Sequence, residues 1–562
     1  MLQASSKLLS WTEETTPARQ PLLRALLHPY TFFLALALAV WLPDGFNIGG
    51  AGDGWMQLGA MIESDAMLRK VLPRMFGSLP MWLGVHLDTH GFRGLQAIML
   101  AFTVLRAALM YEIAARLVPG NRHFALAAGL LTAFHPADRS FFWLGASGLH
   151  FAFVTALAAC LCAVIYLQGA KRRYLLLTFI FQFLSGFTYS GFLPLMAALP
   201  AGAWYLERLA GRPKSRWFLL QVNVVIVAAI IADLVMIHGG VGRDSHVMDL
   251  SAYWAIKAYI WTLGQMLGAW WDLLVGLRLW YLLPACIMGL YGVLLWRWGG
   301  RHDGGPEPAA APKMKWLIWG LFGLAGLSYL PYAISTVRYL PDRTLLGAGL
   351  FAYCALFLLF TERRTRFGRE RLAAIMFVLL AILTTLTGLE KRQYWLDGYR
   401  EQERLLSALA RALPQPSARA FILVRLPRPD DAALLNDFTY REPTFTEALR
   451  YMYGDLSLRG GFYGFGNDRA SFDARGMTSR LPQPGDGKPS FAGYPHLIMV
   501  DYFPDEDSVR IVDGTGLRAA AGLKADAAGY APHPGTAPSS AALMCSMLEA
   551  DFRPAYCLGP SR

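Results

Sequence analysis

The sequence predicts an α-helical polytopic membrane bundle followed by a small extracytoplasmic α/β domain. Of its 562 residues, 55% are hydrophobic and only 16% are charged, whereas about a quarter of the residues of a soluble protein are charged. The mean hydropathy is +0.33. Apolar runs follow one another from Tyr30 to Leu389, which excludes a peripheral protein or one with a single anchor.

The apolar runs have room for about eleven transmembrane helices, each needing about 20 residues. Their odd number puts the two ends of the chain on opposite sides of the membrane. Gly/Pro-rich residues 299–312 predict a linker between two groups of helices. The expected spans are 30–43, 94–118, 124–137, 148–168, 174–188, 189–206, 217–236, 280–297, 316–334, 344–361 and 373–389.

The charges orient this bundle. Residues 1–400 carry 35 Lys+Arg and 21 Asp+Glu, whereas residues 401–562 carry 17 and 19, so the basic excess belongs to the membrane part and indicates no nucleic-acid partner. Basic clusters mark cytoplasmic loops. We therefore expect a cytoplasmic segment 1–29, a bundle 30–389 and an outer domain 390–562 in a bacterial inner (plasma) membrane. The clusters that fall on one side are Arg122, 171–173, 208–216, 297–315 and 363–371.

Two outer loops and the tail are long enough to fold. Loop 44–93 contains an apolar pattern up to Leu72 that predicts an interfacial helix, and Trp-rich loop 237–279 predicts a pair of such helices. The tail predicts strands at 420–425, 496–503 and 508–513 and a helix at 444–453. Its two cysteines, Cys545 and Cys557, are expected to form a disulfide, with two unpaired thiols as the alternative.

Acidic residues gather in the first outer loop. Asp53 follows the glycine-rich stretch 49–52 and precedes the helical pattern, so it is a candidate catalytic carboxylate; the alternative is a helix N-cap. Its supporting acids are Asp44, Glu63 and Asp65, and His86 lies just before the second span as a weaker candidate.

Two arginines are expected on the outer side, although basic residues are generally enriched in cytoplasmic loops. Arg338 and Arg343, between the ninth and tenth spans, are candidates for holding a donor phosphate. The alternatives are a salt bridge to Asp342 or snorkelling. Arg139, with His135 and Asp138, and Lys257, with Arg243, are weaker candidates for the same site. Arg106, inside the second span, must face the bundle, and a structural pair is favoured over contact with a carrier phosphate.

This layout resembles the GT-C superfamily of membrane glycosyltransferases. The likeness covers the cytoplasmic N-terminus, the acidic first outer loop, the many-helix bundle and the outer C-terminal domain, together with segment 86–96 before the second span. It implies transfer from a polyprenyl-phosphate-linked sugar to a glycan, lipid or protein acceptor, with Asp53 as base or metal-associated acid. A divalent cation therefore stays open as a cofactor. The sequence departs from the superfamily by lacking a paired-acid motif, and its Trp-Trp-Asp at 270–272 lies in a middle loop rather than in the tail.

Two other classes remain as alternatives. An O-antigen-type polymerase or ligase has a similar number of spans, but carries its basic residues in two large middle loops and has no folded tail. A polytopic transporter shows interrupted helices at matching positions in two halves and polar residues near the midplane. Here the acids and the unexpected arginines gather outside, which favours the transferase.

Overall fold

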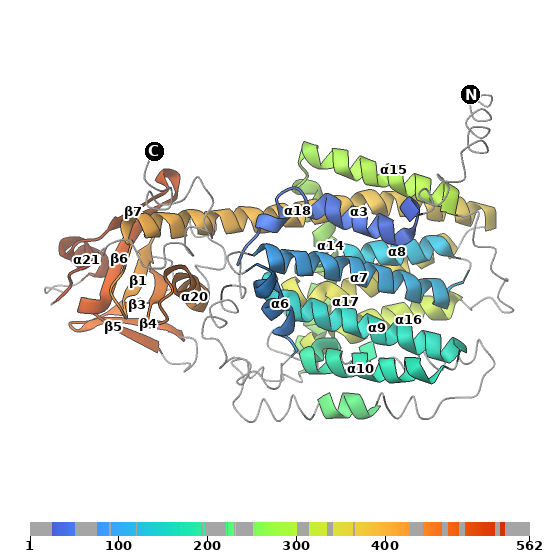
Figure 1. Ribbon diagram of the computed structural model, residues 1–562, viewed down its shortest axis with the longest axis horizontal. Coiled ribbons are helices and arrows are strands. Elements are labelled where there is room, and N and C mark those ends of the chain that lie inside the picture. Colours follow the sequence, from blue (N-terminus) through green and yellow to red (C-terminus); the bar gives the residue numbers. More distant parts are fainter. Residues whose placement is uncertain are drawn as a thin grey trace.

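The computed structural model describes residues 25–50, 55, 76–88, 92–119, 121–169, 171–192, 195–196, 221, 223–229, 231, 251–299, 314–333, 341–362, 366–426, 442–463, 470–482, 489–522 and 529–533. Figure 1 shows a bundle of roughly parallel and antiparallel helices on one side and two β-sheets on the other. The long helix α18 (Arg366–Ala412) belongs to both parts and joins them.

The bundle helices are apolar around most of their circumference, as helices that meet lipid on one side and protein on the other must be. Helix α7 packs against α8 and α9, α9 against α10, α16 against α17, and α15 against α18. The helices are α3 (Pro29–Trp41), α6 (Leu79–Leu87), α7 (Arg93–Leu117), α8 (Arg122–Ala133), α9 (Ser147–Gly169), α10 (Arg172–Thr188), α15 (Leu282–Gly299), α16 (Met314–Ala333) and α17 (Pro341–Glu362), with 3-10 turns at Gly45–Asn47, Leu144–Ala146, Ser190–Phe192 and Leu279–Tyr281.

We call the end of the bundle that faces the β-sheets the sheet-side end, and the other the far end (Figure 1). Helix α7 begins at the sheet-side end, and α3 begins at the far end, where the Tyr30 hydroxyl donates to Glu112 near the end of α7. Helix α8 returns to the sheet-side end. There the segment 134–143 connects it to the start of α9.

Five described helical segments are long and apolar enough to cross a membrane. The protein is thus mostly helical with several membrane-spanning candidates, as the sequence predicts, but the expected total of eleven stays a prediction. Helices α3 and α8 have only 13 and 12 residues, and the expected spans 189–206 and 217–236 lie largely outside the described residues. The five segments are Arg93–Leu117, Leu144–Gln168, Leu279–Arg297, Met314–Ala333 and Glu370–Ala412.

Helix α14 (Ala252–Val275) lies across three bundle helices in turn. Its Tyr259 hydroxyl donates to the Gly326 carbonyl of α16 at 2.8 Å, and its Met266 carbonyl accepts from the Tyr353 hydroxyl of α17 at 2.9 Å. Its C-terminal part then reaches α18. Where the sequence predicts two helices in loop 237–279, the structure describes this one; residues 237–250 lie outside the described residues.

Helix α18 runs through residue 390, where the sequence predicts the start of the outer domain. Its 47 residues make a rod of about 70 Å at 1.5 Å per residue. The charged residues Lys391 and Arg392 are of the kind that usually follows a membrane span at the membrane surface, yet both are buried. Helix propensity does not stop at a membrane surface, so the helix continues to Ala412 and packs against β7.

The described residues of the C-terminal region form two sheets. In the first, ordered β2-β1-β6-β7, β1 pairs in parallel with β2 and β6, and β7 pairs antiparallel with β6; the second, β3-β4-β5, is antiparallel. The expected strands at 420–425, 496–503 and 508–513 correspond to β1, β6 and β7, and the expected helix to α20. The elements are β1 (Phe421–Arg425), α20 (Glu442–Tyr453), β2 (Arg459–Tyr463), β3 (Ala470–Phe472), β4 (Gly476–Pro482), β5 (Pro489–Gly493), β6 (Leu497–Phe503), β7 (Ser508–Ile511) and α21 (Gly514–Ala521).

Both faces of the first sheet are covered. Because side chains alternate along a strand, Ile422 and Val424 point to one face and Phe421 and Leu423 to the other. The first pair belongs to the same hydrophobic core as α18, α20 and the bundle, whereas the second pair packs in a separate core with residues of the second sheet and α21. The sheet region and the bundle therefore share a continuous core.

Candidate functional site

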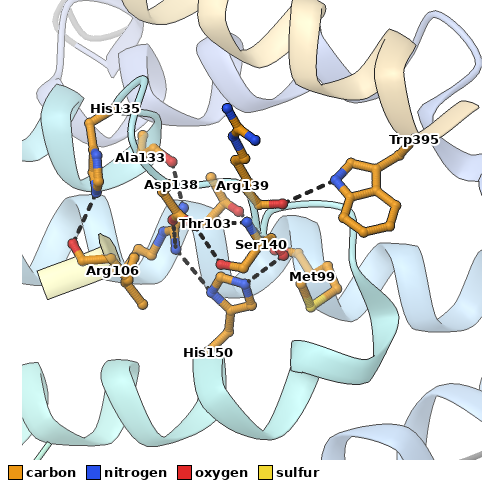
Figure 2. Close-up of polar contacts among 11 residues, drawn as sticks. Met99, Thr103, Arg106, Ala133, His135, Asp138, Arg139, Ser140, His150 and Trp395 are labelled. Carbon is orange, nitrogen blue, oxygen red and sulfur yellow. Dashed lines mark hydrogen bonds and ion pairs between the residues drawn. The ribbon is translucent and has the colours of Figure 1, made fainter. Parts of the chain in front are cut away.

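A buried polar cluster lies at the sheet-side end of the bundle, around segment 134–143 (Figure 2). Every residue of this segment is buried except Arg139, which is partly exposed. The cluster consists of Arg106 from α7, His150 from α9, and His135, Asp138 and Ser140 from the segment itself. Burial of so many polar groups is affordable only if they satisfy one another.

Arg106 is the centre of the cluster. Its Nη2 donates to the Ala133 carbonyl at 2.6 Å, and its Nη1 lies 2.9 Å from His150 Nδ1 and 3.5 Å from Asp138 Oδ2. The side chains of Arg106 and Asp138 are both 0% exposed. Of the two roles the sequence leaves open for Arg106, the structure gives it the structural pair inside the bundle.

The hydrogen bonds define the protonation states. A guanidinium can only donate, so His150 Nδ1 accepts from Arg106, and His150 Nε2 carries the proton that it donates to the Ser140 carbonyl at 3.0 Å. His135 likewise uses its Nε2 proton, on the Leu346 carbonyl of α17 at 2.9 Å. The His150 imidazole is therefore neutral in this arrangement, and the positive charge of Arg106 is balanced by Asp138.

Asp138 also fixes the local backbone. Its Oδ1 accepts from the Ser140 backbone N–H at 2.9 Å and from the Ser140 hydroxyl. Burial disfavours the charged carboxylate, but the Arg106 guanidinium, aided by the hydrogen bond from Ser140, outweighs that effect and holds the pKa of Asp138 below its ordinary value. Asp138 is therefore an ionised structural anchor, closed off from solvent, rather than a group that lines an open vestibule.

Arg139 has a different environment from its neighbours. Its guanidinium points away from the cluster (Figure 2), and its Nη2 lies 2.9 Å from Asp272 Oδ2 of α14. Its backbone carbonyl accepts from the Trp395 indole of α18 at 3.1 Å. Segment 134–143 is thereby connected to α7, α9, α14, α17 and α18, while one cationic side chain remains accessible.

Trp55, within the sequence region 44–93, contacts both α18 and the sheet region. Trp55 is 1% exposed, and its indole donates to Gln402 Oε1 of α18 at 3.0 Å. Its ring also packs against Tyr451 of α20. A Cβ on Gly49 would collide with the ring of Tyr399, and one on Gly50 would lie 2.7 Å from the Trp55 ring, so this close approach explains both glycines.

Tyr451 connects this contact to the sheet region. Burial, together with the nearby Asp88 carboxylate, raises the pKa of the Tyr451 phenol to about 12. The phenol is therefore neutral at physiological pH. Residues from the first loop, α18 and α20 thus form one packed junction, and Asp53 is only two residues before its central tryptophan.

The structure describes only some of the residues singled out from the sequence. Asp53, Glu63, Asp65, Arg338, Cys545 and Cys557 lie outside the described residues, so their predicted roles and the disulfide stay predictions. Arg343 lies in the first turn of α17, one turn before Leu346, and its side chain is not described. The contact of His135 with Leu346 puts that turn beside segment 134–143.

The other candidates are scattered. Asp44 is exposed, with a left-handed backbone (φ 66°) just after α3. His86 is exposed and interacts with Trp82 of its own helix, with Nδ1 2.8 Å from the Trp82 carbonyl oxygen. Lys257 is exposed near the start of α14, its ammonium 4.8 Å from the centre of the Trp254 ring. Of the candidates that the structure describes, Arg139 and the backbone of Arg343 lie beside the cluster, and His135 and Asp138 belong to it.

Sequence reasoning missed His150 and Trp395, and it noted Asp272 only as the last residue of the Trp-Trp-Asp at 270–272. His150 gives a signal, since a histidine within an apolar run is costly unless it is paired. The sequence does not reveal that Asp272 and Trp395 contact Arg139, because they are 133 and 256 residues away from it. Among the described residues, no group of three His, Cys, Asp or Glu side chains is arranged to hold a metal ion.

Comparison with protein-family models and with curated protein sequences gives no match to this chain.

Proposed function

We propose that the protein is a membrane glycosyltransferase that moves a sugar from a polyprenyl-phosphate carrier to a glycan, lipid or protein acceptor at the sheet-side end of the bundle. One observation carries the proposal: Trp55, two residues after Asp53 in the sequence, packs against Tyr399 of α18 and Tyr451 of the sheet region. On this proposal Asp53 acts at the junction of the bundle and the sheet region, to which Trp55 belongs. A lipid-linked donor and a water-borne acceptor would meet there.

The charge distribution supports an outer position for this junction. Basic residues stand at the helix ends remote from the sheets: Arg122 begins α8, Arg172 begins α10, and Arg297 is in the last turn of α15. Cytoplasmic ends of membrane helices are enriched in such residues. The far end is then cytoplasmic, and the sheet-side end faces the outside of a bacterial inner membrane.

The reaction needs two kinds of group. A carboxylate must accept the proton of the acceptor hydroxyl as the new glycosidic bond forms, and Asp53 has that role. Cationic donors must stabilise the carrier phosphate as it leaves with the bonding electron pair, and Arg338 and Arg343 have that one. The turn that carries Arg343 adjoins the buried cluster, at the same end of the bundle as Trp55.

A transporter is the weaker alternative. The buried Arg106–Asp138 pair is the kind of intramembrane charge that marks a transport path, but it is closed on all sides by Ala133, His150 and Ser140. A folded sheet region that shares the core of the bundle is better suited to binding an acceptor.

Mass spectrometry of lipid-linked sugars and envelope glycans after deletion of the gene tests the proposal. We expect a polyprenyl-phosphate sugar to accumulate and one sugar to disappear from a glycan, glycolipid or glycoprotein. The wild-type chain should reverse both changes, an Asp53→Asn chain should reverse neither, and Asp505→Asn, in an exposed turn of the sheet region, should act as wild type. Unchanged lipid-linked sugars and glycans in the deletion strain would reject the proposal.

A further inference from the structure

We infer that Arg139 binds the carrier phosphate and that Asp272 occupies its guanidinium until the carrier arrives. The inference rests on the proposed function for the identity of the ligand. It adds to Arg338 and Arg343 a third cation, one whose surroundings the structure describes. It also assigns Asp272 a role, as an internal competitor of the phosphate.

The first support is the contrast between Arg139 and the segment that carries it. The segment 134–143 is otherwise buried, whereas the Arg139 side chain is 31% exposed. A buried segment offers a single long cationic side chain to the surface at the sheet-side end. Since a charge of this type at a membrane surface is well placed to meet a lipid headgroup, this exposure is the first requirement of a phosphate site.

The second support is that the backbone around Arg139 is held in place by its neighbours. The residue before Arg139 is held by the Arg106 guanidinium, the residue after it donates two hydrogen bonds to Asp138, and the Arg139 carbonyl accepts from Trp395. A binding site has higher affinity when folding has already ordered its residues, because less conformational entropy is then lost on binding. Only the Arg139 side chain remains to be ordered by a ligand.

The third support is the nature of the present partner. Asp272 holds one guanidinium nitrogen at 2.9 Å, and its own side chain is 48% exposed. Ion pairs this exposed contribute little free energy, so exchange is easy. The phosphodiester of a sugar-bearing carrier can contact the planar guanidinium with its two non-bridging oxygens, whereas Asp272 contacts one guanidinium nitrogen, so the phosphate can displace Asp272.

The fourth support is the expected depth of Asp272 and Arg139 in the membrane. Around Asp272, helix α14 exposes large apolar side chains, with Leu267 at 65%, Trp271 at 68% and Val275 at 70%. Apolar and tryptophan side chains on the outside of an interfacial helix sit at the boundary between acyl chains and headgroups. A polyprenyl phosphate places its phosphate at that same boundary.

The test is a pair of substitutions with opposite expected effects. The apparent Kd of a radiolabelled polyprenyl phosphate is measured on the full-length protein in phosphatidylcholine nanodiscs. Arg139→Ala should weaken binding about tenfold, since a charge-assisted hydrogen bond is lost, with Arg139→Lys in between. Asp272→Asn should tighten binding severalfold, because the competitor is gone. The matched control is Asp397→Asn, which removes the partner of Arg278 from a pair 3.1 Å long with 50% and 52% exposed side chains, and it should change nothing.

Three outcomes would overturn the inference. They are unchanged binding in Arg139→Ala, weakened binding in Asp272→Asn, and an Asp397→Asn effect as large as that of Asp272→Asn. Competitor arms identify the source of the phosphate: excess phosphatidylglycerol or inorganic phosphate should fail to displace the probe, and full displacement by either would reject a carrier site. Sugar transfer is measured separately. Absent transfer with the predicted binding pattern refutes the proposed function alone, and transfer without that pattern refutes this inference alone.

Discussion

Two ion pairs made by consecutive residues differ in almost everything except charge. Asp138 pairs with Arg106 at 3.5 Å with both side chains fully buried, whereas Arg139 pairs with Asp272 at 2.9 Å with both side chains partly exposed. The longer pair is the one that the fold depends on, because a buried charge left without its partner has no water to replace it. The shorter pair can be exchanged. Burial rather than distance therefore separates the structural charge from the available one.

The largest effect should come from breaking the buried pair on one side. Arg106→Met leaves Asp138 as an uncompensated buried carboxylate and removes the donor to the Ala133 carbonyl, so the free energy of unfolding should fall by about 3–5 kcal/mol. Unfolding in mixed detergent micelles measures it. A fall of less than about 1 kcal/mol in the free energy of unfolding would mean that the buried cluster does not stabilise segment 134–143. The contrast between the buried and the exposed ion pair would then be wrong.

Removing both members of the buried pair should cost less than removing one. In Arg106→Met with Asp138→Leu no charge is left unpaired, and apolar replacements of buried ion pairs are often nearly neutral. We expect the double variant to regain at least about half of the stability that Arg106→Met loses, less the hydrogen bonds of Asp138 to Ser140. A double variant as unstable as the sum of the two single variants would show that the two charges do not compensate each other.

The smallest effect on stability should come from the exposed pair. Asp272→Asn should change the free energy of unfolding by less than about 1 kcal/mol, since exposed ion pairs contribute about 0–1 kcal/mol. The same unfolding assay serves, with Asp397→Asn as the comparison, since the Asp397 side chain is 52% exposed and that of Asp272 is 48% exposed. If Asp272→Asn destabilised the protein as much as Arg106→Met does, Arg139 would have to be counted with the structural charges.

The same contrast explains what the sequence could and could not predict. Arg106 is recognisable because a charge in a 25-residue apolar helix must find a partner, and the strands β1 and β6 are recognisable from their apolar, β-branched runs. The partners themselves are not predictable, since Asp272 comes to Arg139 only through the path of α14 across the bundle. A local pattern reveals a residue that needs a partner, but only the fold determines which one it meets.

The C-terminal end of α18 could not be predicted from the sequence for a related reason. The run Glu390, Lys391 and Arg392 has the composition of a membrane boundary, but Lys391 pairs with Glu390 at 2.7 Å and Arg392 lies 4.9 Å from the centre of the Trp280 ring. Charges that are solvated in most loops are here enclosed by protein. The glycines at 49 and 50 show the opposite case, in which a visible motif has a packing cause that becomes clear only beside Tyr399 and Trp55.

The most direct test of the account is sugar transfer by the Asp53→Asn protein in reconstituted vesicles, with the lipid-linked sugar identified from the deletion strain as donor. We expect normal insertion, unchanged binding of polyprenyl phosphate and a transfer rate about 10²–10⁴-fold lower, because a general base has been removed. Full activity in Asp53→Asn would transfer the role to Asp44, Glu63 or Asp65. Full activity in variants of all four acids would contradict the claim that the first outer loop supplies the catalytic carboxylate.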